Sequence, residues 1–579
     1  MKKAELQNAS FQDVSLPFKL LERDVNRWVS ELPVTDIQRC CGLVLPSLKA
    51  LNRQSMPAIT RFETLEELRP TVFLLSQKLE SQFVGTRFPF EEKTYESAVN
   101  SIEFQRELAH GYELVSMEKS FTDQIHFNNL LRARTLHRAL QSYSLVMVRQ
   151  GLLYQVREFE SWKEVYGLFS FAERNDIHNV RNKDNETQTE SSVEDVFKSI
   201  LLFALSETFH YQQNDILKIY NFLVKFAGHA ALRPVNREVD DNIASHYFKL
   251  DLDEPPRRLA NGKTIVDSGA YRYLSTEPMV RLFGERTVPS AALDNESATY
   301  ALPNATILES VLQRLVVLQE RKFTRLLETK EYKLVFGLDH LIAVFSNTFK
   351  VRGKQGKSIT KLDLVDEFEL EHSDTDDGRK VSRSNSILTT LLNDSRTQVS
   401  TTDIWPADAN NEILHLEDIV HIYKGGNSSP KGYCFTYSEK SSSKVKVGDL
   451  VGIYENESKI NIGLISWLEY SYDGGLSFGI KLLSREAEVA QIDFLDNLAI
   501  EYTETALTQI TNANALLLPA IPTSMKSISL LTLPLKYEVG NWIALKTRNK
   551  SKIYRLERLL DSSSAVSHFE LFEFNDTCR

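Results

Sequence analysis

The sequence predicts an α+β multidomain protein, with an all-helical N-terminal half and a β-barrel followed by a second β-barrel in the C-terminal half. Three observations support this. Apolar residues recur every three or four positions up to about residue 230, a linker-like segment covers residues 352–412, and the hydrophobic period is two after about residue 413. The chain of 579 residues is long enough for several domains, and its composition, 42% hydrophobic and 25% charged, is ordinary for a globular protein.

The net charge of -10 argues against nucleic acid or an anionic membrane as a partner, because no overall positive field would attract either. We find no apolar run of about 18 residues, so we expect no membrane span, and we find no signal peptide. The four cysteines, Cys40, Cys41, Cys434 and Cys578, have neither the spacing of a disulfide framework nor that of a zinc site. These features predict a cytoplasmic protein without a bound metal.

Residues 1–230 are predicted to form a helical interaction domain. Helical periodicity is clear at 61–69 and at 127–165. Ser191 and Glu194 have the spacing of a capping box that opens an amphipathic helix, and a further helix ends at Gly228. Stacked helices of this kind usually bind other proteins, so we expect an unidentified protein partner on this domain.

Residues 231–305 are predicted to be a mixed connector, in which an alternating strand ends at Pro255 and Pro256. A second capping box, Thr306 with Glu309, then starts a helix that runs into RKFTR, residues 321–325. We assign residues 306–495 to one barrel domain that carries a mobile insertion at about 352–412. RGKQGKS and SDTDDG within this insertion only partly match a phosphate-binding loop and a calcium loop, and we interpret both as solvated loops.

The C-terminal half has the alternation of antiparallel strands. Residues 460–468 and 476–482 place apolar side chains on one face, with a turn at Asp473-Gly474-Gly475 between them. The segments NWIALKT, KIYRLERL and HFELFEF predict further strands. This is more than one barrel needs, so residues 496–579 are predicted to form a second small β-barrel.

Two short motifs frame the first barrel. Arg321 and Arg325 form an RxxxR pair, and NSSPKG, Asn427 to Gly432, matches [D/N]xSxxG. In this order, followed by VGDLVGI, IGLISW and LSFGIKLL, they resemble the PilZ domain, whose members bind the bacterial second messenger cyclic di-GMP. The helical segments and DLDEPPRRL also look like a family of long proteobacterial proteins in which a helical N-terminal region precedes a PilZ-like domain.

The resemblance implies that Arg321 and Arg325 clamp the guanines and phosphates of cyclic di-GMP, and that Asn427, Ser429 and Gly432 complete the pocket. The chemistry agrees, because arginine can bind a guanine edge bidentately, stack on a purine or pair with phosphate. The predicted function is a cyclic di-GMP receptor that relays binding to a protein partner by shifting conformational populations. We expect no cofactor, no catalytic residue and no enzyme activity, because no base, nucleophile or metal cluster accompanies either motif.

One departure leaves alternatives open. Arg325 and Asn427 are about a hundred residues apart, whereas the motifs of simple PilZ domains lie closer together, and YKLVFGLDHLIAVF, read as a strand, occupies part of the gap. If this separation means that the two motifs do not form a pocket, the chain is a ligand-free PilZ-like scaffold for protein contacts. A third interpretation is an RNA-binding barrel in which Trp467, Phe478 and Trp542 stack on bases.

Overall fold

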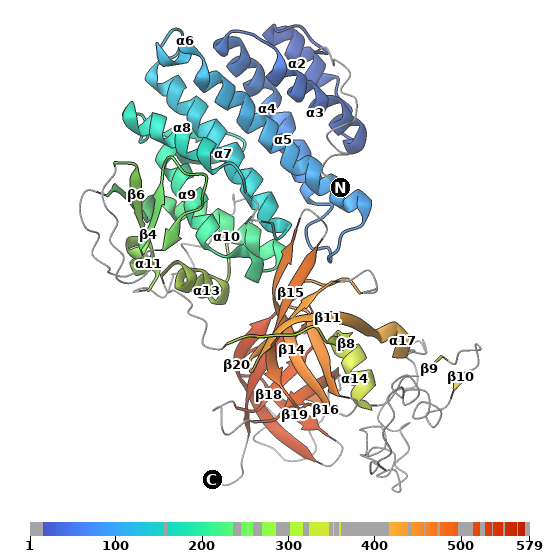
Figure 1. The fold of residues 1–579 in the computed structure, drawn as a ribbon. Helices are drawn as coiled ribbons and strands as arrows, with labels where there is room; N and C mark the ends of the chain where they lie inside the picture. Colours follow the sequence, from blue (N-terminus) through green and yellow to red (C-terminus); the bar gives the residue numbers. More distant parts are fainter. Residues whose placement is uncertain are drawn as a thin grey trace, which may run out of the picture. The chain divides into compact units, whose positions relative to one another are not determined.

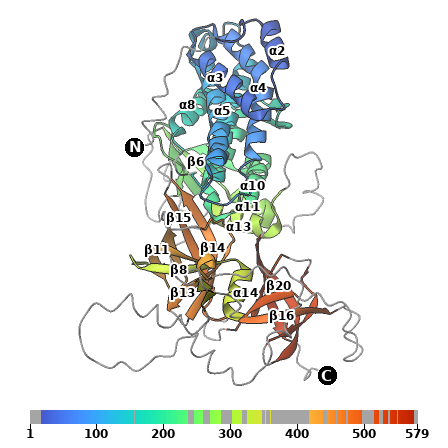
Figure 2. The same ribbon diagram turned by 90° about the vertical axis from the view of Figure 1, so that its right-hand side faces the viewer.

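The computed structural model divides the chain into two compact units, drawn in Figure 1 and, turned by 90°, in Figure 2. The helical unit comprises 1–322 and 469–474, and the barrel unit comprises 323–468 and 475–579. The structure describes residues 16–155, 157, 159–235, 245–258, 269–284, 302–316, 324–346, 351–352, 358–359, 416–437, 443–456, 459–471, 475–495, 513–520, 527–534, 537–547, 550–563 and 565–573.

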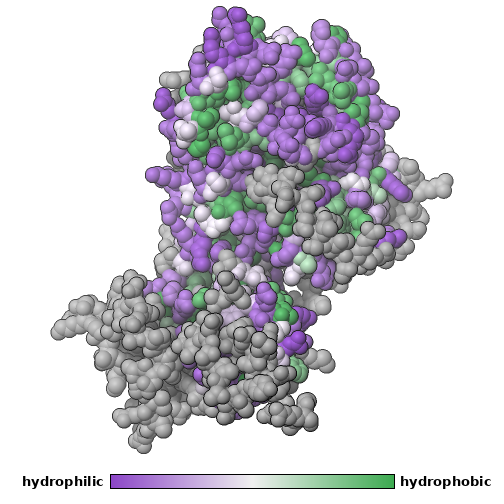
Figure 3. All heavy atoms as spheres, turned by 180° about the vertical axis from the view of Figure 1, so that it is seen from behind, coloured by the Kyte–Doolittle hydropathy of each residue, from purple (hydrophilic) through white to green (hydrophobic). Residues whose placement is uncertain are grey.

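The helical unit is a stack of amphipathic helices in which the long helices α4, α5 and α7 run beside one another (Figure 1). Leu65, Leu68, Val72, Leu75 and Leu79 of α4 follow the helical period and are almost fully buried. From behind, the surface of this unit is largely polar, with apolar residues in separate patches (Figure 3). The helices are α2 (Glu22–Ser30), α3 (Ile37–Arg53), α4 (Ala58–Glu80), α5 (Glu92–Met117), α6 (Lys119–Thr122), α7 (Asn129–Leu152), α8 (Trp162–Arg174), α9 (Val193–Leu205) and α10 (Gln213–Phe226).

Helix α9 begins one residue later than the sequence suggests. The predicted capping pair, Ser191 with Glu194, is wrong, because Ser192 caps the helix and forms the reciprocal box with Asp195. Ser191 instead ends a short hairpin, β1 (Asn182–Asp184) and β2 (Thr189–Ser191), that helical periodicity did not predict.

Asp184 anchors this hairpin in the helix core. Its side chain is fully buried and accepts hydrogen bonds from Arg69 at 2.6 and 2.9 Å, and Arg138 lies 3.1 Å away. Burial acts to raise the pKa of Asp184, but the hydrogen bond and charge of Arg69, together with Arg138, outweigh it and lower the pKa to about 2.

The connector contains a small antiparallel sheet of order β3-β6-β4-β5 and two helices. The predicted capping pair of Thr306 with Glu309 is also wrong, because Asn304 accepts the hydrogen bond from the backbone of Ile307 and the helix starts at Ala305. The elements are β3 (Ala231–Pro234), β4 (Ser245–Lys249), β5 (Arg257–Arg258), β6 (Tyr271–Ser275), α11 (Glu277–Gly284) and α13 (Ala305–Val316).

The middle barrel closes through the order β12-β15-β14-β13-β8-β11, with β11 also pairing with β12 and with the short strand β7. Alternating apolar residues fill its interior, as the period of two predicted. Its strands are β7 (Leu326–Leu327), β8 (Glu331–Phe336), β11 (Val420–Ser429), β12 (Gly432–Thr436), β13 (Leu450–Asn456), β14 (Lys459–Tyr470) and β15 (Leu476–Ser484), and the four-residue helix α17 (Leu416–Ile419) precedes β11.

The segment YKLVFGLDHLIAVF is only half strand, which corrects the sequence interpretation. β8 ends at Phe336, Gly337 has a φ of +90°, and helix α14 (Leu338–Ser346) follows. Leu338, Leu341 and Ile342 lie on the buried face of α14. At the predicted insertion the structure describes only β9 (Val351–Arg352) and β10 (Ser358–Ile359). SDTDDG and the middle of RGKQGKS, residues 353–357, therefore lie outside the described residues.

A second closed barrel of order β16-β17-β18-β21-β20-β19 confirms the predicted architecture. One apolar core joins it to the middle barrel. Leu516, Leu518 and Leu531 of the second barrel pack in the same cluster as Leu341 of α14 and Ile462 of β14. The strands are β16 (Glu488–Leu495), β17 (Ala513–Leu518), β18 (Ser529–Thr532), β19 (Trp542–Lys546), β20 (Ser551–Ser562) and β21 (Ser567–Glu573). The four-part domain division remains a prediction. Among the described helices, none has the length and apolar character needed to cross a membrane.

Candidate ligand-binding site

Strand β7 brings the arginine motif to the NSSPKG turn. Leu327 pairs with Asn427 and Leu326 with Ser428, and β8 pairs with the preceding part of β11. Arg325 is the residue directly before β7, so it lies at the end of this ladder, next to the β11–β12 turn. The hundred intervening residues therefore do not separate the two motifs in space. Arg321 lies outside the described residues.

Strand alternation assigns the predicted residues to one face. Directly paired residues share a face of a sheet, so Asn427 faces the same side as Leu327, and Ser429 the same side as Gly432. Asn427 and Ser429 are two positions apart and share a face as well. Continuing the alternation by one residue beyond β7 puts Arg325 on this side too. We call the face that carries Asn427, Ser429 and Gly432 the motif face.

The motif face offers free polar groups. Arg325 is exposed and makes no hydrogen bond or ion pair with the described residues, and the same holds for the amide side chain of Asn427, which is half-buried. The Ser429 hydroxyl donates to the Gly432 carbonyl at 3.3 Å across the turn. A guanidinium, an amide and a hydroxyl at one edge can bind a base edge or a phosphate, as expected for a nucleotide ligand.

Gly432 is required by close packing and not by positive φ. A Cβ there would lie 2.1 Å from the carbonyl oxygen of Ile480, so no other residue fits while β12 keeps its pairing with β15. Gly479 is similar, because a Cβ would lie 1.8 Å from Nε1 of Trp467. Gly479 pairs with Cys434, which in turn pairs with Asn427, so the half-buried Trp467 indole lies over the motif face.

The opposite face of the ladder fixes β7 in place. The Ser428 hydroxyl and the Tyr332 phenol both donate to the carboxylate of Glu328, and the Glu328 backbone N–H donates to the Gly426 carbonyl at 3.2 Å. Burial raises the pKa of Tyr332, and its hydrogen bond to Glu328 raises it further. Tyr332 is therefore a neutral donor, and the ladder that carries Arg325 is tied to β11 by side chains as well as by backbone.

The sequence interpretation missed these supports. In the sequence Glu328 looks like any other acidic residue, because its partner Ser428 lies a hundred positions away. Trp467 was considered only as a surface on which nucleic-acid bases could stack. Leu326 and Leu327, 67% and 91% exposed, also border the site. In the sequence, the only signal for this part of the site was a leucine pair directly after the arginine motif.

The aromatic residues do not form the continuous stacking surface that the RNA-binding interpretation needs. Phe478 is fully buried in the middle barrel and packs edge-on against Tyr423 at 5.3 Å. Trp542 belongs to the second barrel. Trp467 alone of the three lies beside the motif residues.

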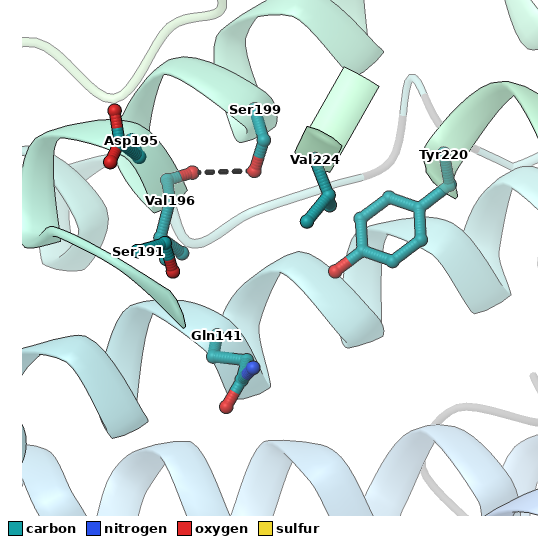
Figure 4. Close-up of a pocket in the computed structure, with 7 residues that line it drawn as sticks. All are labelled: Gln141, Ser191, Asp195, Val196, Ser199, Tyr220 and Val224. Atoms are coloured by element: carbon teal, nitrogen blue, oxygen red, sulfur yellow. Dashed lines mark hydrogen bonds between the residues drawn. The ribbon is translucent and has the colours of Figure 1, made fainter. Parts of the chain in front are cut away.

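A small cavity in the helical unit is a poor alternative site (Figure 4). Its volume is about 10 Å³, room for roughly one water molecule. It is lined by Gln141, Ser191, Asp195, Val196, Ser199, Tyr220 and Val224. Nearby His137 is fully buried with Nε2 2.8 Å from the Ser191 hydroxyl, and burial lowers its pKa to about 3, so it is a packed neutral residue.

Comparison with protein-family models gives three matches along the chain. Residues 23–237 match the N-terminal domain of the cyclic-di-GMP receptor FimW, residues 247–488 match its middle PilZ domain, and residues 504–575 match its C-terminal β-barrel domain. No curated protein and no solved structure matches the chain. The PilZ match spans both motifs and every strand of the middle barrel.

Proposed function

Because this chain belongs to the FimW family of cyclic-di-GMP receptors, we propose that it binds cyclic di-GMP on the motif face of its middle barrel. The ligand-binding residues are Arg321, Arg325, Asn427, Ser429 and Gly432. The pairing of β7 with β11 carries this proposal, because it puts Arg325 beside the NSSPKG turn.

Each residue has a distinct part. Arg325 binds a guanine edge or a phosphate through its planar guanidinium, and Arg321 acts with it from the preceding segment. Asn427 and Ser429 supply neutral hydrogen bonds, while Gly432 keeps the turn close to β15. The indole of Trp467 offers an adjoining surface on which a guanine can stack.

The protein acts as a receptor and not as an enzyme in this proposal, and it needs no cofactor. It functions in the cytoplasm, where reducing conditions keep Cys40, Cys41 and Cys434 as the free thiols seen in the structure. Cyclic di-GMP incubated with the protein is therefore expected to be recovered intact by chromatography. Release of linear dinucleotide or GMP in proportion to protein purity would contradict this.

The helical unit relays binding to a protein partner. This part of the proposal is supported by the stacked amphipathic helices, whose surface is available to other proteins, and by the course of the chain. The chain leaves the helical unit after Lys322, three residues before Arg325, so Arg325 is close along the sequence to α13 of that unit.

The deciding experiment is a calorimetric titration of the full chain with cyclic di-GMP, with GTP as a comparison ligand. Arg325→Ala is expected to weaken cyclic di-GMP binding about ten- to hundredfold, because a hydrogen bond to a charged group contributes about 1.5–3 kcal/mol. Arg558→Ala is the matched control, since that arginine is 69% exposed and lies on the second barrel. Absence of binding by the unaltered protein would favour the ligand-free scaffold, and equal affinity of the two variants would refute the assigned site.

A further inference from the structure

The helical unit contains a segment that belongs by sequence to the middle barrel. Residues 469 and 470 are the last two of β14, and residues 471–474 lie between β14 and β15 in the sequence, yet all six are part of the helical unit. The chain therefore enters and leaves the helical unit at this tip as well as at Lys322, after α13. We call residues 469–471, the part that the structure describes, the hairpin tip.

Aromatic residues of the helical unit hold the hairpin tip. Tyr470 is 9% exposed, and its ring lies edge-on to Phe88 and Tyr95 with centroids 5.6 and 6.3 Å away. Its backbone N–H donates to the carbonyl of Tyr154 at 3.3 Å. The neighbouring Glu469 pairs with Arg157 at 3.3 Å.

Tyr154 links the hairpin tip to Tyr211. Its φ of 58° is unusual for a bulky side chain, so the surrounding structure must enforce it. The Tyr154 hydroxyl, in a buried setting, donates to the carbonyl of Tyr211 at 3.1 Å. The backbone of Tyr154 therefore contacts the hairpin tip while its side chain contacts Tyr211.

Tyr211 completes the path to α13. Its hydroxyl lies 3.0 Å from the Ser310 hydroxyl and accepts a hydrogen bond from Nε of Arg314 at 3.2 Å. The Arg314 guanidinium also donates a hydrogen bond to the carboxylate of Glu207. Like Tyr154, Glu207 has a positive φ, of 52°. Both Ser310 and Arg314 belong to α13, the last described helix before Arg325.

We propose that Tyr211 is a positioning residue that couples the hairpin tip to α13, so that cyclic di-GMP affinity and the seating of Tyr470 depend on one another. The inference rests on the proposed function. Arg325 follows α13 closely along the chain, so a ligand that holds Arg325 acts on α13, and Tyr211 transmits that effect through Tyr154 to the tip. Such coupling is reciprocal, so loosening the tip weakens the ligand by the same factor.

The test compares two tyrosine-to-phenylalanine variants in the full chain. Tyr211→Phe removes the hydroxyl that binds α13. Tyr220→Phe is the matched control, because its buried hydroxyl bonds to Ser144 at 2.8 Å within the same unit but outside the path. Cyclic di-GMP affinity is measured by calorimetry, and hydrogen exchange of the Tyr470 amide is measured with and without saturating ligand.

We expect ligand to slow exchange of the Tyr470 amide in the unaltered protein and in Tyr220→Phe, but not in Tyr211→Phe. Affinity should fall about two- to tenfold in Tyr211→Phe but not in Tyr220→Phe, because one net hydrogen bond provides a factor of this size. Arg314→Gln should give the same pattern, which protects the test if Tyr211→Phe folds poorly. Failure of the unaltered protein to bind would refute the proposed function. Binding with the same affinity and exchange response in all variants would refute the coupling alone.

Discussion

Substitution of Asp184 by asparagine should destabilise the helical unit strongly, because this carboxylate neutralises two arginines in a dry core. Arg69 and Arg138 are about as buried as Asp184 itself, with side chains 4% and 6% exposed. Asparagine keeps the size and one acceptor but removes the carboxylate paired with Arg69, and it leaves Arg138 with Glu66 alone, 3.5 Å away. Breaking one side of a buried ion pair typically costs about 3–5 kcal/mol.

The pKa of Asp184 gives an independent magnitude. A lowering from 3.8 to about 2 corresponds to about 2–3 kcal/mol of preferential interaction with the charged form. Because the folded-state pKa is the lower one, this stabilisation is present above about pH 4 and is lost as the pH falls towards 2. The stability should also depend on His137, whose pKa is lowered from 6.5 to about 3 because burial disfavours the protonated ring. The folded state therefore loses stability relative to the unfolded state as the pH falls from 6.5 towards 3.

Urea denaturation followed by circular dichroism at a helix-sensitive wavelength measures the effect. We expect Asp184→Asn to lower the free energy of unfolding of the helical unit by about 3 kcal/mol at pH 7. The difference from the unaltered protein should shrink below pH 4. Glu190→Gln is the control, because that residue lies on the same hairpin and its side chain is 60% exposed opposite Arg181. A loss no larger than that of the control would show that the Asp184 carboxylate does not stabilise the helix core through Arg69 and Arg138.

Three further outcomes follow from the barrel. Arg325→Lys should weaken cyclic di-GMP binding in a calorimetric titration, although less than Arg325→Ala, because an ammonium keeps the charge but not the planar fork. Gly432→Ala should destabilise the barrel unit by about 1–3 kcal/mol in urea, since its Cβ meets backbone, whereas Gly42→Ala, with open space on α3, should be neutral or slightly stabilising. Deleting residues 360–400 should leave ligand affinity unchanged, because β8 and β11 pair on either side of that segment; a large loss would show that the segment takes part in binding.

Local patterns predicted the parts of the fold that depend on local physics. The alternation at 460–468 and 476–482 predicted β14 and β15, since a residue's side of a strand follows from its position alone. Capping at α9 and α13 was misplaced by one or two residues, because several Ser, Asn and Thr side chains near a helix start can accept the same hydrogen bonds. The hairpin around Asp184 was missed because arginines on distant helices hold it.

In the candidate site, too, local patterns predicted individual residues but not their long-range contacts. The motifs named Arg325, Asn427, Ser429 and Gly432 without any structure, but only the ladder shows that Asn427 and Leu327 are neighbours. Pairing across a hundred residues is decided by register and by the fit of Glu328 to Ser428 and Tyr332, which no local pattern encodes. The positions of Trp467 over Gly479 and of Tyr470 among aromatics of the helical unit are long-range in the same sense.

The apolar core that joins the two barrels has a consequence for protein turnover. Leu516 and Leu531 of the second barrel pack in one cluster with Leu341 and Ile462 of the first, so neither barrel can open without exposing the other. A ligand that binds only the folded state stabilises it by about 2.7 kcal/mol at a hundred times its Kd. Proteases act on the opened form, so saturation of the motif face should slow cleavage of the second barrel about a hundredfold. The level of a second messenger would thus set the lifetime of a domain that it never touches.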